Sequence, residues 1–391
     1  MSNELAARLA LIALPGVGPA RLRWLLSAGP AEEVIAKIRN ESLPPSIGPA
    51  PPGVTAKLIQ NWAIALRRKG PSEHLADVSA IGAEVLEPDH ARWPFANDPE
   101  PPIVLFALGD LKLLSAAPVV AIVGTRRCST IGRRVASDLG THLAEAGATV
   151  VSGLASGVDG AAHRGVLAAG GKPIGVVGTG LDVVYPAANR QLWNDVVAHG
   201  LLLSEAMPGA APERWRFPAR NRLIAGLADV VVIVESHDHG GSMHTVNEAV
   251  ERGLPVMAVP GSVTNPAASG TNRLLVEGCP PARSAQDVLD FLGLAVPTAS
   301  TEDVLSAAQA GSGEPSCAQL RLVVNDDAPS RTDRTPLGRI ILDQVAAGST
   351  HIDDLMAATN VTIPELLSEV NQLSERGAVQ LDGSTVSLAS P

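Results

Sequence analysis

The chain of 391 residues is 46% hydrophobic with a mean hydropathy of +0.18, which predicts two or three domains with a sizeable core. No run approaches the roughly 18 apolar residues of a transmembrane helix, and the N-terminus lacks the basic start of a signal peptide. Three scattered cysteines (Cys128, Cys279 and Cys317) argue against a disulfide framework or a zinc site and favour the cytoplasm.

Residues 1–70 are expected to form a small helical domain. Two apolar helical stretches flank the turn PGVG at residues 15–18, a pattern typical of a helix-hairpin-helix or SAM-like domain. Backbone N–H groups at such a turn can hold a phosphate. A helical packing module whose hairpin binds nothing explains the pattern equally well.

Further along the chain, apolar runs alternate with helical stretches. The runs predict buried parallel strands near 118–124, 148–153, 172–180, 201–205, 229–235 and 254–261. The stretches between them predict helices near 131–146, 159–169, 189–199, 219–227 and 243–252. This alternation predicts an α/β fold with a doubly wound sheet and helices on both faces.

The C-terminal quarter is predicted to hold a flexible linker and a small domain. Residues 295–335 are rich in Ala, Ser, Thr, Asp, Pro and Gly, which is typical of a linker. Residues 336–391 predict three helices and two strands around Asp382 and Gly383, in the order of a winged helix. Because this segment holds 2 basic and 7 acidic residues, it is expected to bind protein or to aid folding rather than to dock on DNA phosphates.

The net charge of −10 therefore does not describe the middle of the chain. Residues 291–391 hold 5 Lys and Arg against 13 Asp and Glu, whereas residues 119–290 hold 14 against 15. A nearly neutral middle segment leaves room for a local basic groove.

Small, hydroxylated and basic residues follow the carboxyl ends of the predicted strands, where open α/β sheets bind their ligands. These residues are Gly124, Thr125, Arg126 and Arg127 after the first strand, Ser152, Gly153, Ser156 and Gly157 after the second, and Gly241 and Ser242 after the strand at 229–235. Small residues let the backbone and a helix N-terminus approach an anion, so the edge of the sheet fits a chain of phosphates.

The segment 212–222, PERWRFPARNR, joins four arginines and two aromatic residues in a chain that is only 3% aromatic. Single-stranded nucleic acid binds basic grooves that also offer aromatic faces, and each stacked base contributes about 1–3 kcal/mol. Arginine adds two-pronged phosphate contacts. The residues concerned are Arg214, Trp215, Arg216, Phe217, Arg220, Asn221 and Arg222. A solvated arginine turn before the helix at 219–227 explains the spacing about as well.

Other chemistries have weaker support in the sequence. The glycines at 153, 157 and 160 lack the spacing of a dinucleotide-binding motif, and no phosphate-binding loop or hydrolase nucleophile motif occurs. His237, His239 and His244 lie on a Gly-rich loop without carboxylates at helical spacing, so no metal site is expected. Asp159 and His163 could pair across one helical turn, although a cap and a structural histidine explain them better. No cofactor is expected.

At these residues the chain resembles the DNA-processing protein A family (DprA, also called Smf). The family-like blocks run in order over about 120–291 and comprise VAIVGTRRCSTIGRRVA, VVSGLASGVDGAAHRGVLAAGGKPIGVVGTGLDVVYPAAN, LLLSE, FPARNRLIAGLADVVVIVE, GLPVMAVPGSVTNPAASGTNRLLVEG and AQDVLDFL. The block FPARNRLIAGL is highly specific, and the helical N-terminal and winged-helix-like C-terminal segments also fit the family.

The resemblance implies an extended Rossmann-like sheet over residues 71–294, between the helical domain and the linker. It implies a cytoplasmic homodimer, formed through the Rossmann-like domain, that is not an enzyme. Such a protein binds single-stranded DNA, protects incoming strands in natural transformation and loads a RecA-type recombinase on them. The implied DNA-binding residues are Gly124, Thr125, Arg126, Gly153, Gly157, Arg214, Phe217, Arg220, Asn221 and Arg222, to which the strand ends add Arg127, Ser152, Gly241 and Ser242.

The chain departs from the family pattern at two turns, and rival functions remain. The family commonly has Ser-Gly-Ser-Leu-x-Thr where this chain has HGGSMHT, and an arginine often found before Gly157 is Ser156 here. One rival is a Rossmann-like nucleotide phosphoribohydrolase, whose PGGxGTxxE motif is matched in part by Thr245 and Glu248, with one extra residue. Another is a signalling hub whose acidic domain binds partners while the sheet holds a nucleotide.

Overall fold

The computed structural model describes residues 3–44, 47–294, 370, 373, 379–382 and 385–388. The chain divides into two compact units, residues 1–305 and residues 306–391. In the second unit, β9 (Val379–Asp382) pairs with β10 (Thr385–Leu388) in antiparallel fashion, which confirms the two strands predicted near the end of the chain. The rest of the predicted linker and winged helix lies outside the described residues.

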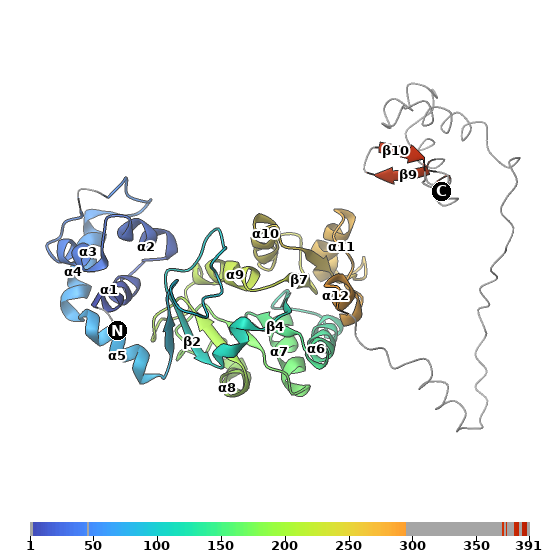
Figure 1. Cartoon of the computed structure of the whole chain (residues 1–391), viewed down its shortest axis with the longest axis horizontal. Helices are drawn as coiled ribbons and strands as arrows, with labels where there is room; N and C mark the ends of the chain where they lie inside the picture. The colour runs from blue at the N-terminus through green and yellow to red at the C-terminus, as the bar shows by residue number, and fades with distance from the viewer. Residues whose placement is uncertain are drawn as a thin grey trace, which may run out of the picture. The chain divides into compact units, whose positions relative to one another are not determined.

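The first unit begins with a helical segment, coloured blue in Figure 1. Its helices are α1 (Asn3–Ile12), α2 (Pro19–Leu26), α3 (Ala31–Arg39), α4 (Ala56–Arg68) and α5 (Pro71–Ala80). Apolar side chains from α1 to α4 form a core of their own, in which Trp62 is fully buried. Leu5 and Leu9 of α1 instead join the core beneath the sheet, so the helical segment and the sheet share buried contacts. The domain boundary at residue 70 stays a prediction.

An eight-stranded sheet follows, with the strand order β1-β2-β6-β5-β4-β3-β7-β8. The strands are β1 (Glu84–Leu86), β2 (Leu105–Gly109), β3 (Val119–Val123), β4 (Thr149–Ser152), β5 (Ile174–Val176), β6 (Leu201–Ser204), β7 (Val230–Ile233) and β8 (Val256–Ala258). The six strands from β3 to β8 are parallel, as the apolar runs predict. The antiparallel pair β1 and β2 next to β6 was not predicted, because a three-residue strand is too short to show alternation.

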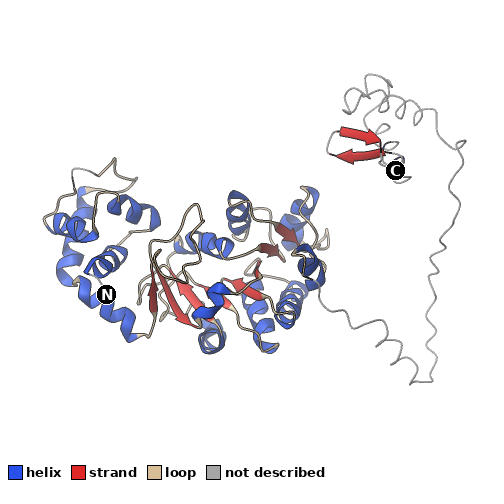
Figure 2. Ribbon diagram, in the orientation of Figure 1, coloured by secondary structure: helices blue, strands red, loops and turns tan. Residues whose placement is uncertain are grey.

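Helices cover both faces of the sheet, as Figures 1 and 2 show. They are α6 (Thr130–Glu145), α7 (Val158–Ala168), α8 (Arg190–His199), α9 (Arg216–Gly226), α10 (Met243–Glu251), α11 (Ser269–Val276) and α12 (Ala285–Phe291), with short 3-10 turns at Leu111–Ser115, Ala187–Asn189 and Pro266–Ala268. α9, α10 and α11 pack on one face, and α6, α7, α8 and α12 pack on the other. Every residue of β3 is buried, as expected for a strand covered on both sides. The predicted doubly wound sheet is confirmed.

The chain order of the strands opens a crevice at one edge of the sheet. The chain runs from β3 outward to β6 and then returns to β7 on the other side of β3. The connections that leave the carboxyl ends of β3 and β7 therefore diverge, and ligands of open α/β sheets bind at such a point.

Candidate nucleic-acid interface

A cleft of about 610 Å³ lies at this crevice. Its walls come from the turn after β3, the first turns of α9 and the loop before α10. Most of the predicted site residues line it, namely Gly124, Thr125, Arg126, Arg127, Arg214, Phe217, Arg220, Asn221, Gly241 and Ser242. The structure thus brings together residues that are more than 100 positions apart in the sequence.

The turn after β3 forms one wall and has a fixed backbone. The Thr125 N–H donates to the Glu235 carbonyl oxygen (2.7 Å), and the Glu235 carboxylate accepts from the Ser129 backbone N–H (2.8 Å) and hydroxyl (2.6 Å). Between these anchors, the Arg126 and Arg127 side chains are exposed to solvent. Glu235, the residue after the apolar run of β7, was not predicted to matter. Its carboxylate occupies the N-terminus of α6, so phosphates are expected to meet the arginines rather than this helix end.

Gly157 holds the turn after β4 against the turn after β3. Its φ of +83° is one that side chains rarely allow, and a Cβ atom there would overlap the Thr125 carbonyl oxygen. The Val158 N–H donates to the same oxygen (3.4 Å). The predicted glycine therefore lies behind the cleft wall, where its role in the structure is close backbone packing.

The first turns of α9 form the facing wall. The helix begins at Arg216, three residues before the predicted start at 219, because Pro218 is tolerated in a first helical turn. Phe217 consequently projects from a helix rather than from a loop. The Arg126 guanidinium carbon lies 4.9 Å from the centre of the Phe217 ring, within the range of a cation–π contact.

Tyr185 extends this aromatic surface and was missed in the sequence. Its ring centre lies 5.2 Å from that of Phe217, with a tilt of 40°, and the residue is 37% exposed. A signal was present, because Tyr185 is the only tyrosine of the chain and follows the predicted strand at 172–180. The cleft therefore contains two neighbouring aromatic rings beside an exposed arginine.

The arginines of the second wall differ sharply in exposure. Arg214 is exposed at the cleft, whereas Arg220 is only 6% exposed. The Arg220 Nη1 donates to the carbonyl oxygens of Gly153 (2.7 Å) and Val176, and a Cβ atom at Gly153 would overlap the guanidinium. Burial lowers the pKa of Arg220 to about 10, so the side chain is still charged at neutral pH. Arg220 thus ties α9 to the ends of β4 and β5.

Asp159 is the acidic residue beneath Arg220. Burial raises the pKa of Asp159, and the positive charge of Arg220 opposes that rise. Among the residues that line the cleft in the described part of the chain, Asp159 is the only acid, and it is 6% exposed. No hydrogen bond joins it to His163 in that part, so the less favoured alternative of a pair across the helical turn does not form.

Two predicted residues lie away from the cleft. Arg222 is 3% exposed and binds both carboxylate oxygens of Glu205 (2.5 and 2.6 Å) and the Glu100 carbonyl oxygen (2.7 Å). Ser152 is fully buried and donates to the Ile122 carbonyl oxygen (2.6 Å). Their contact with DNA stays a prediction without geometric support, and both have evident roles in packing. Gly153 lines a smaller pocket beside the cleft, together with Tyr185 and Phe217.

The loop before α10 contributes small residues and no metal site. Gly241 is exposed and faces open space, while the buried Ser242 hydroxyl donates to the Ser236 hydroxyl (2.8 Å). His237, His239 and His244 are exposed, and the described residues contain no group of three or more His, Cys, Asp and Glu side chains that could hold a metal. No helix in that same portion is long and apolar enough to cross a membrane.

Glu248, on which the phosphoribohydrolase hypothesis depends, is not part of the cleft lining. Its carboxylate accepts from Arg252 Nη1 (2.6 Å), and Arg252 also binds Asp98 (2.8 Å). A carboxylate engaged in this way is not placed to stabilise a reacting sugar in the cleft.

The comparisons with known proteins agree with this arrangement. The family model for DNA recombination-mediator protein A matches residues 84–293. The chain is 42% identical over 193 residues to the DNA processing protein DprA of Bacillus subtilis, covering 49% of this chain and 65% of that relative. It is 32% identical to the protein Smf of Synechocystis over 97% of both chains.

A solved structure shows the same fold. The DNA processing protein A of Streptococcus pneumoniae superimposes with a TM-score of 0.60 and 32% identity, over 74% of this chain and 98% of that one. Residues 84–293, which the family model matches, contain the sheet, the cleft and both of its walls. The chain therefore belongs to the family of DNA recombination-mediator protein A.

Proposed function

We propose that this protein binds single-stranded DNA in the cleft between the turn after β3 and α9. Exposed guanidinium groups at Arg126, Arg127 and Arg214 face a site whose one acidic lining residue in the described part is buried. A surplus of accessible positive charge without a competing carboxylate suits a polyanion. The observation that carries the proposal is the contact of Arg126 with Phe217, which puts a phosphate-binding group and a ring face side by side.

The aromatic rings favour an unpaired strand over a duplex. Bases in a duplex stack on one another, so their faces are hidden, whereas an unpaired base can stack on a protein ring at a gain of about 1–3 kcal/mol. Phe217 and Tyr185 supply two such rings 5.2 Å apart. Binding by phosphate contacts and stacking breaks no bond, and the cleft lacks an accessible pair of acid and base groups among the described residues.

We further propose that the bound strand is protected and passed to a RecA-type recombinase during natural transformation in the cytoplasm. The support is membership of a recombination-mediator family together with a cleft of about 610 Å³ that is lined by exposed arginines. A homodimer through the Rossmann-like domain is part of this proposal. Val263 and Val276, which are 94% and 88% exposed beyond β8, are candidates for its contact surface.

Fluorescence anisotropy with labelled single-stranded and double-stranded oligonucleotides of several lengths tests the central part of the proposal. Wild-type protein is expected to prefer the single strand, and Phe217→Leu is expected to reduce that preference. Phe291→Leu is the matched control, because Phe291 is 44% exposed on α12 and does not line the cleft. Equal affinity for the two forms of DNA in the wild-type protein would refute the proposal.

A further inference from the structure

Trp215 connects the DNA cleft to the helical segment. It is the residue immediately before α9 and lies two positions before Phe217. A Cβ atom at Gly18, the residue before α2, would be 2.9 Å from Cζ3 and 3.3 Å from Cη2 of Trp215. The indole therefore rests directly on the backbone of the PGVG turn, and any side chain at Gly18 would displace it.

The remaining sides of Trp215 are held by its own neighbours. Its Nε1–H donates to Glu213 Oε2 (2.7 Å), and the guanidinium carbon of Arg216 lies 4.6 Å from the ring. Arg216 also pairs with Glu213 (3.2 Å), and its side chain is 19% exposed. The Arg216 charge is thus paired at the contact between the helical segment and α9, which we call the seam. Trp215 is 37% exposed, but neither Trp215 nor Arg216 lines the cleft as the sequence suggested.

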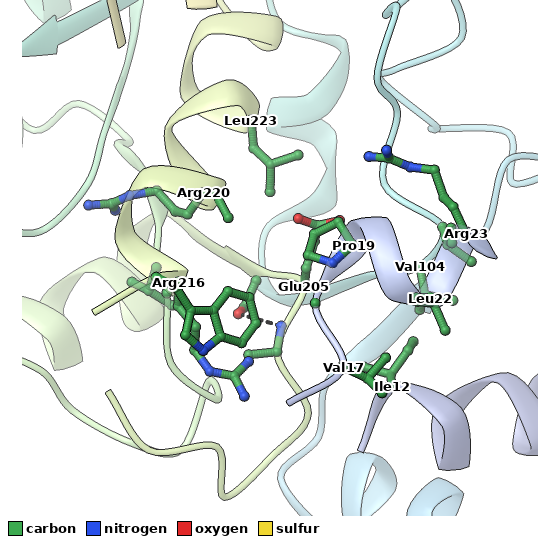
Figure 3. Close-up of a pocket in the computed structure, with 18 of the residues that line it drawn as sticks. Ile12, Val17, Pro19, Leu22, Arg23, Val104, Glu205, Arg216, Arg220 and Leu223 are labelled. Carbon is green, nitrogen blue, oxygen red and sulfur yellow. Dashed lines mark hydrogen bonds between the residues drawn. The ribbon is translucent and has the colours of Figure 1, made fainter. Parts of the chain in front are cut away.

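The gap beneath this contact is too small for a ligand. Figure 3 shows Val17, Pro19 and Leu22 of the helical segment across from Arg216 and Leu223 of α9, with Glu205 between them. The cavity that they line is about 50 Å³, which is room for a few water molecules, whereas a cavity that binds one benzene ring has about 150 Å³. The seam is therefore a packing contact between the helical segment and α9.

A second contact fixes the same seam. Arg23 of α2 pairs with the Glu100 carboxylate (2.5 Å), and the Glu100 carbonyl oxygen accepts from Arg222 of α9 (2.7 Å). The helical segment is thus joined to α9 both before its first turn and further along the helix. Movement of the PGVG turn would be transmitted through Trp215 to Arg214, the residue before it, and to Phe217, two positions after it.

We infer that Trp215 is a positioning residue: the helical segment, through Gly18 and Trp215, sets the place of Arg214 and Phe217 in the cleft without touching DNA. The inference rests on the proposed binding of single-stranded DNA. It assigns a role to the PGVG turn, whose use as a phosphate site had been one of two explanations for its sequence.

Two substitutions approach the seam from opposite sides. Trp215→Ala removes the indole, and Gly18→Leu pushes it away without substituting any residue of the cleft. Both are expected to weaken binding of an oligothymidylate by about fivefold to tenfold, which lies within the range of coupling between contacting residues. Trp215→Phe keeps a ring on Gly18 and is expected to restore most of the affinity.

Matched controls separate positioning from general destabilisation. Gly48→Leu adds the same side chain at a glycine with open space around it, and Trp24→Ala removes a tryptophan of α2 that does not line the seam. Both controls are expected to leave affinity unchanged. In a Phe217→Leu background, Trp215→Ala is expected to cause little further loss. Fully additive losses would mean that Trp215 contacts DNA itself, and unchanged affinity in Trp215→Ala and Gly18→Leu would overturn the inference.

Amide hydrogen exchange in the free protein keeps the inference testable without DNA. Faster exchange over residues 214–220 is expected in Trp215→Ala and Gly18→Leu, but not in Trp24→Ala or Gly48→Leu. Unchanged exchange in that segment would refute the positioning role even if DNA binding is confirmed. Faster exchange in a protein that binds no single-stranded DNA would instead show that the proposed function is wrong while the mechanical link exists.

Discussion

The two walls of the cleft both carry arginines, but they use them differently. In the turn after β3, the backbone is fixed by Glu235 and the side chains of Arg126 and Arg127 are exposed. In α9 the opposite holds, because Arg220 and Arg222 are buried in hydrogen bonds to the protein itself. The comparison teaches that the number of arginines in a motif does not give the number of phosphate contacts. The exposed arginines, which include Arg214 just before α9, are accessible to a ligand, whereas Arg220 and Arg222 hold the position of α9.

The largest expected effect is a loss of stability of the folded protein, and it distinguishes the arginines of α9 from those of the turn after β3. Arg222→Met leaves the Glu205 carboxylate, which is 21% exposed, without its partner, and this loss is expected to cost roughly 3 kcal/mol, the lower end of the range for buried ion pairs. We expect a reduction of that size in the free energy of urea-induced unfolding, while the salt dependence of DNA binding by the folded fraction stays as in the wild type. Normal stability with lost affinity would instead place Arg222 at the DNA.

A smaller effect is expected where the two turns touch. Gly157→Ala forces a side chain into a positive-φ conformation, at a cost of about 1–3 kcal/mol, and also pushes on the Thr125 carbonyl oxygen. The displaced turn should bind single-stranded DNA about tenfold more weakly, which corresponds to a loss of about 1.4 kcal/mol in binding free energy.

Gly170→Ala is the matched control for this substitution. Gly170 has a similar φ of +73°, but nothing lies within 4 Å of a Cβ atom there. Thermal unfolding and DNA titration of both variants test whether this turn positions the arginines. Both variants should be less stable than the wild type, but only Gly157→Ala should bind single-stranded DNA more weakly. Equal affinities in the two variants would mean that the turn after β4 does not set the position of the arginines.

An effect that depends on pH concerns His163, which lies fully buried on α7. Burial lowers the pKa of His163 from 6.5 to about 3, with a further contribution from the charge of Arg220. Between those two pH values the unfolded chain binds a proton and the folded chain does not. The free energy of unfolding should therefore decrease as the pH falls from 6.5 to 3, by up to about 1.4 kcal/mol per pH unit from this residue.

Chemical unfolding of His163→Asn across that pH range measures this contribution. The variant should be less stable overall, and its stability should depend on pH less steeply than that of the wild type, by about one proton. His199→Asn, at an exposed position, should keep the wild-type slope. If His163→Asn also keeps that slope, the histidine is not buried in its neutral form.

The sequence was sufficient to predict the parallel strands and the edge of the sheet at which the turns after these strands meet. Apolar runs mark β3 to β8, and the rule that ligands lie at the carboxyl ends of strands then places Gly124 and Arg126 at the site. The predicted start of α9 at 219 is three residues late, because the helix begins at Arg216 and includes Pro218 in its first turn, where proline is tolerated.

The sequence could not predict which arginines are buried and which are exposed. The partners that bury Arg222 are Glu205 and Glu100, which lie 17 and 122 positions away in the chain. Only the packed fold decides which guanidinium meets a buried carbonyl oxygen and which meets solvent. The same holds for Trp215, whose contact with Gly18 depends on the docking of the helical segment.

The most direct test of the account is the salt dependence of oligothymidylate binding by Arg126→Ala/Arg127→Ala. Its matched control is Arg273→Ala/Arg283→Ala, which removes two exposed arginines outside the cleft and changes the net charge equally. Loss of phosphate contacts should lower the slope of log affinity against log salt by about 0.7 for each contact in the first variant and leave it unchanged in the control. Equal slopes in the two variants would contradict the account, because the arginines after β3 would then act only through the overall charge of the protein.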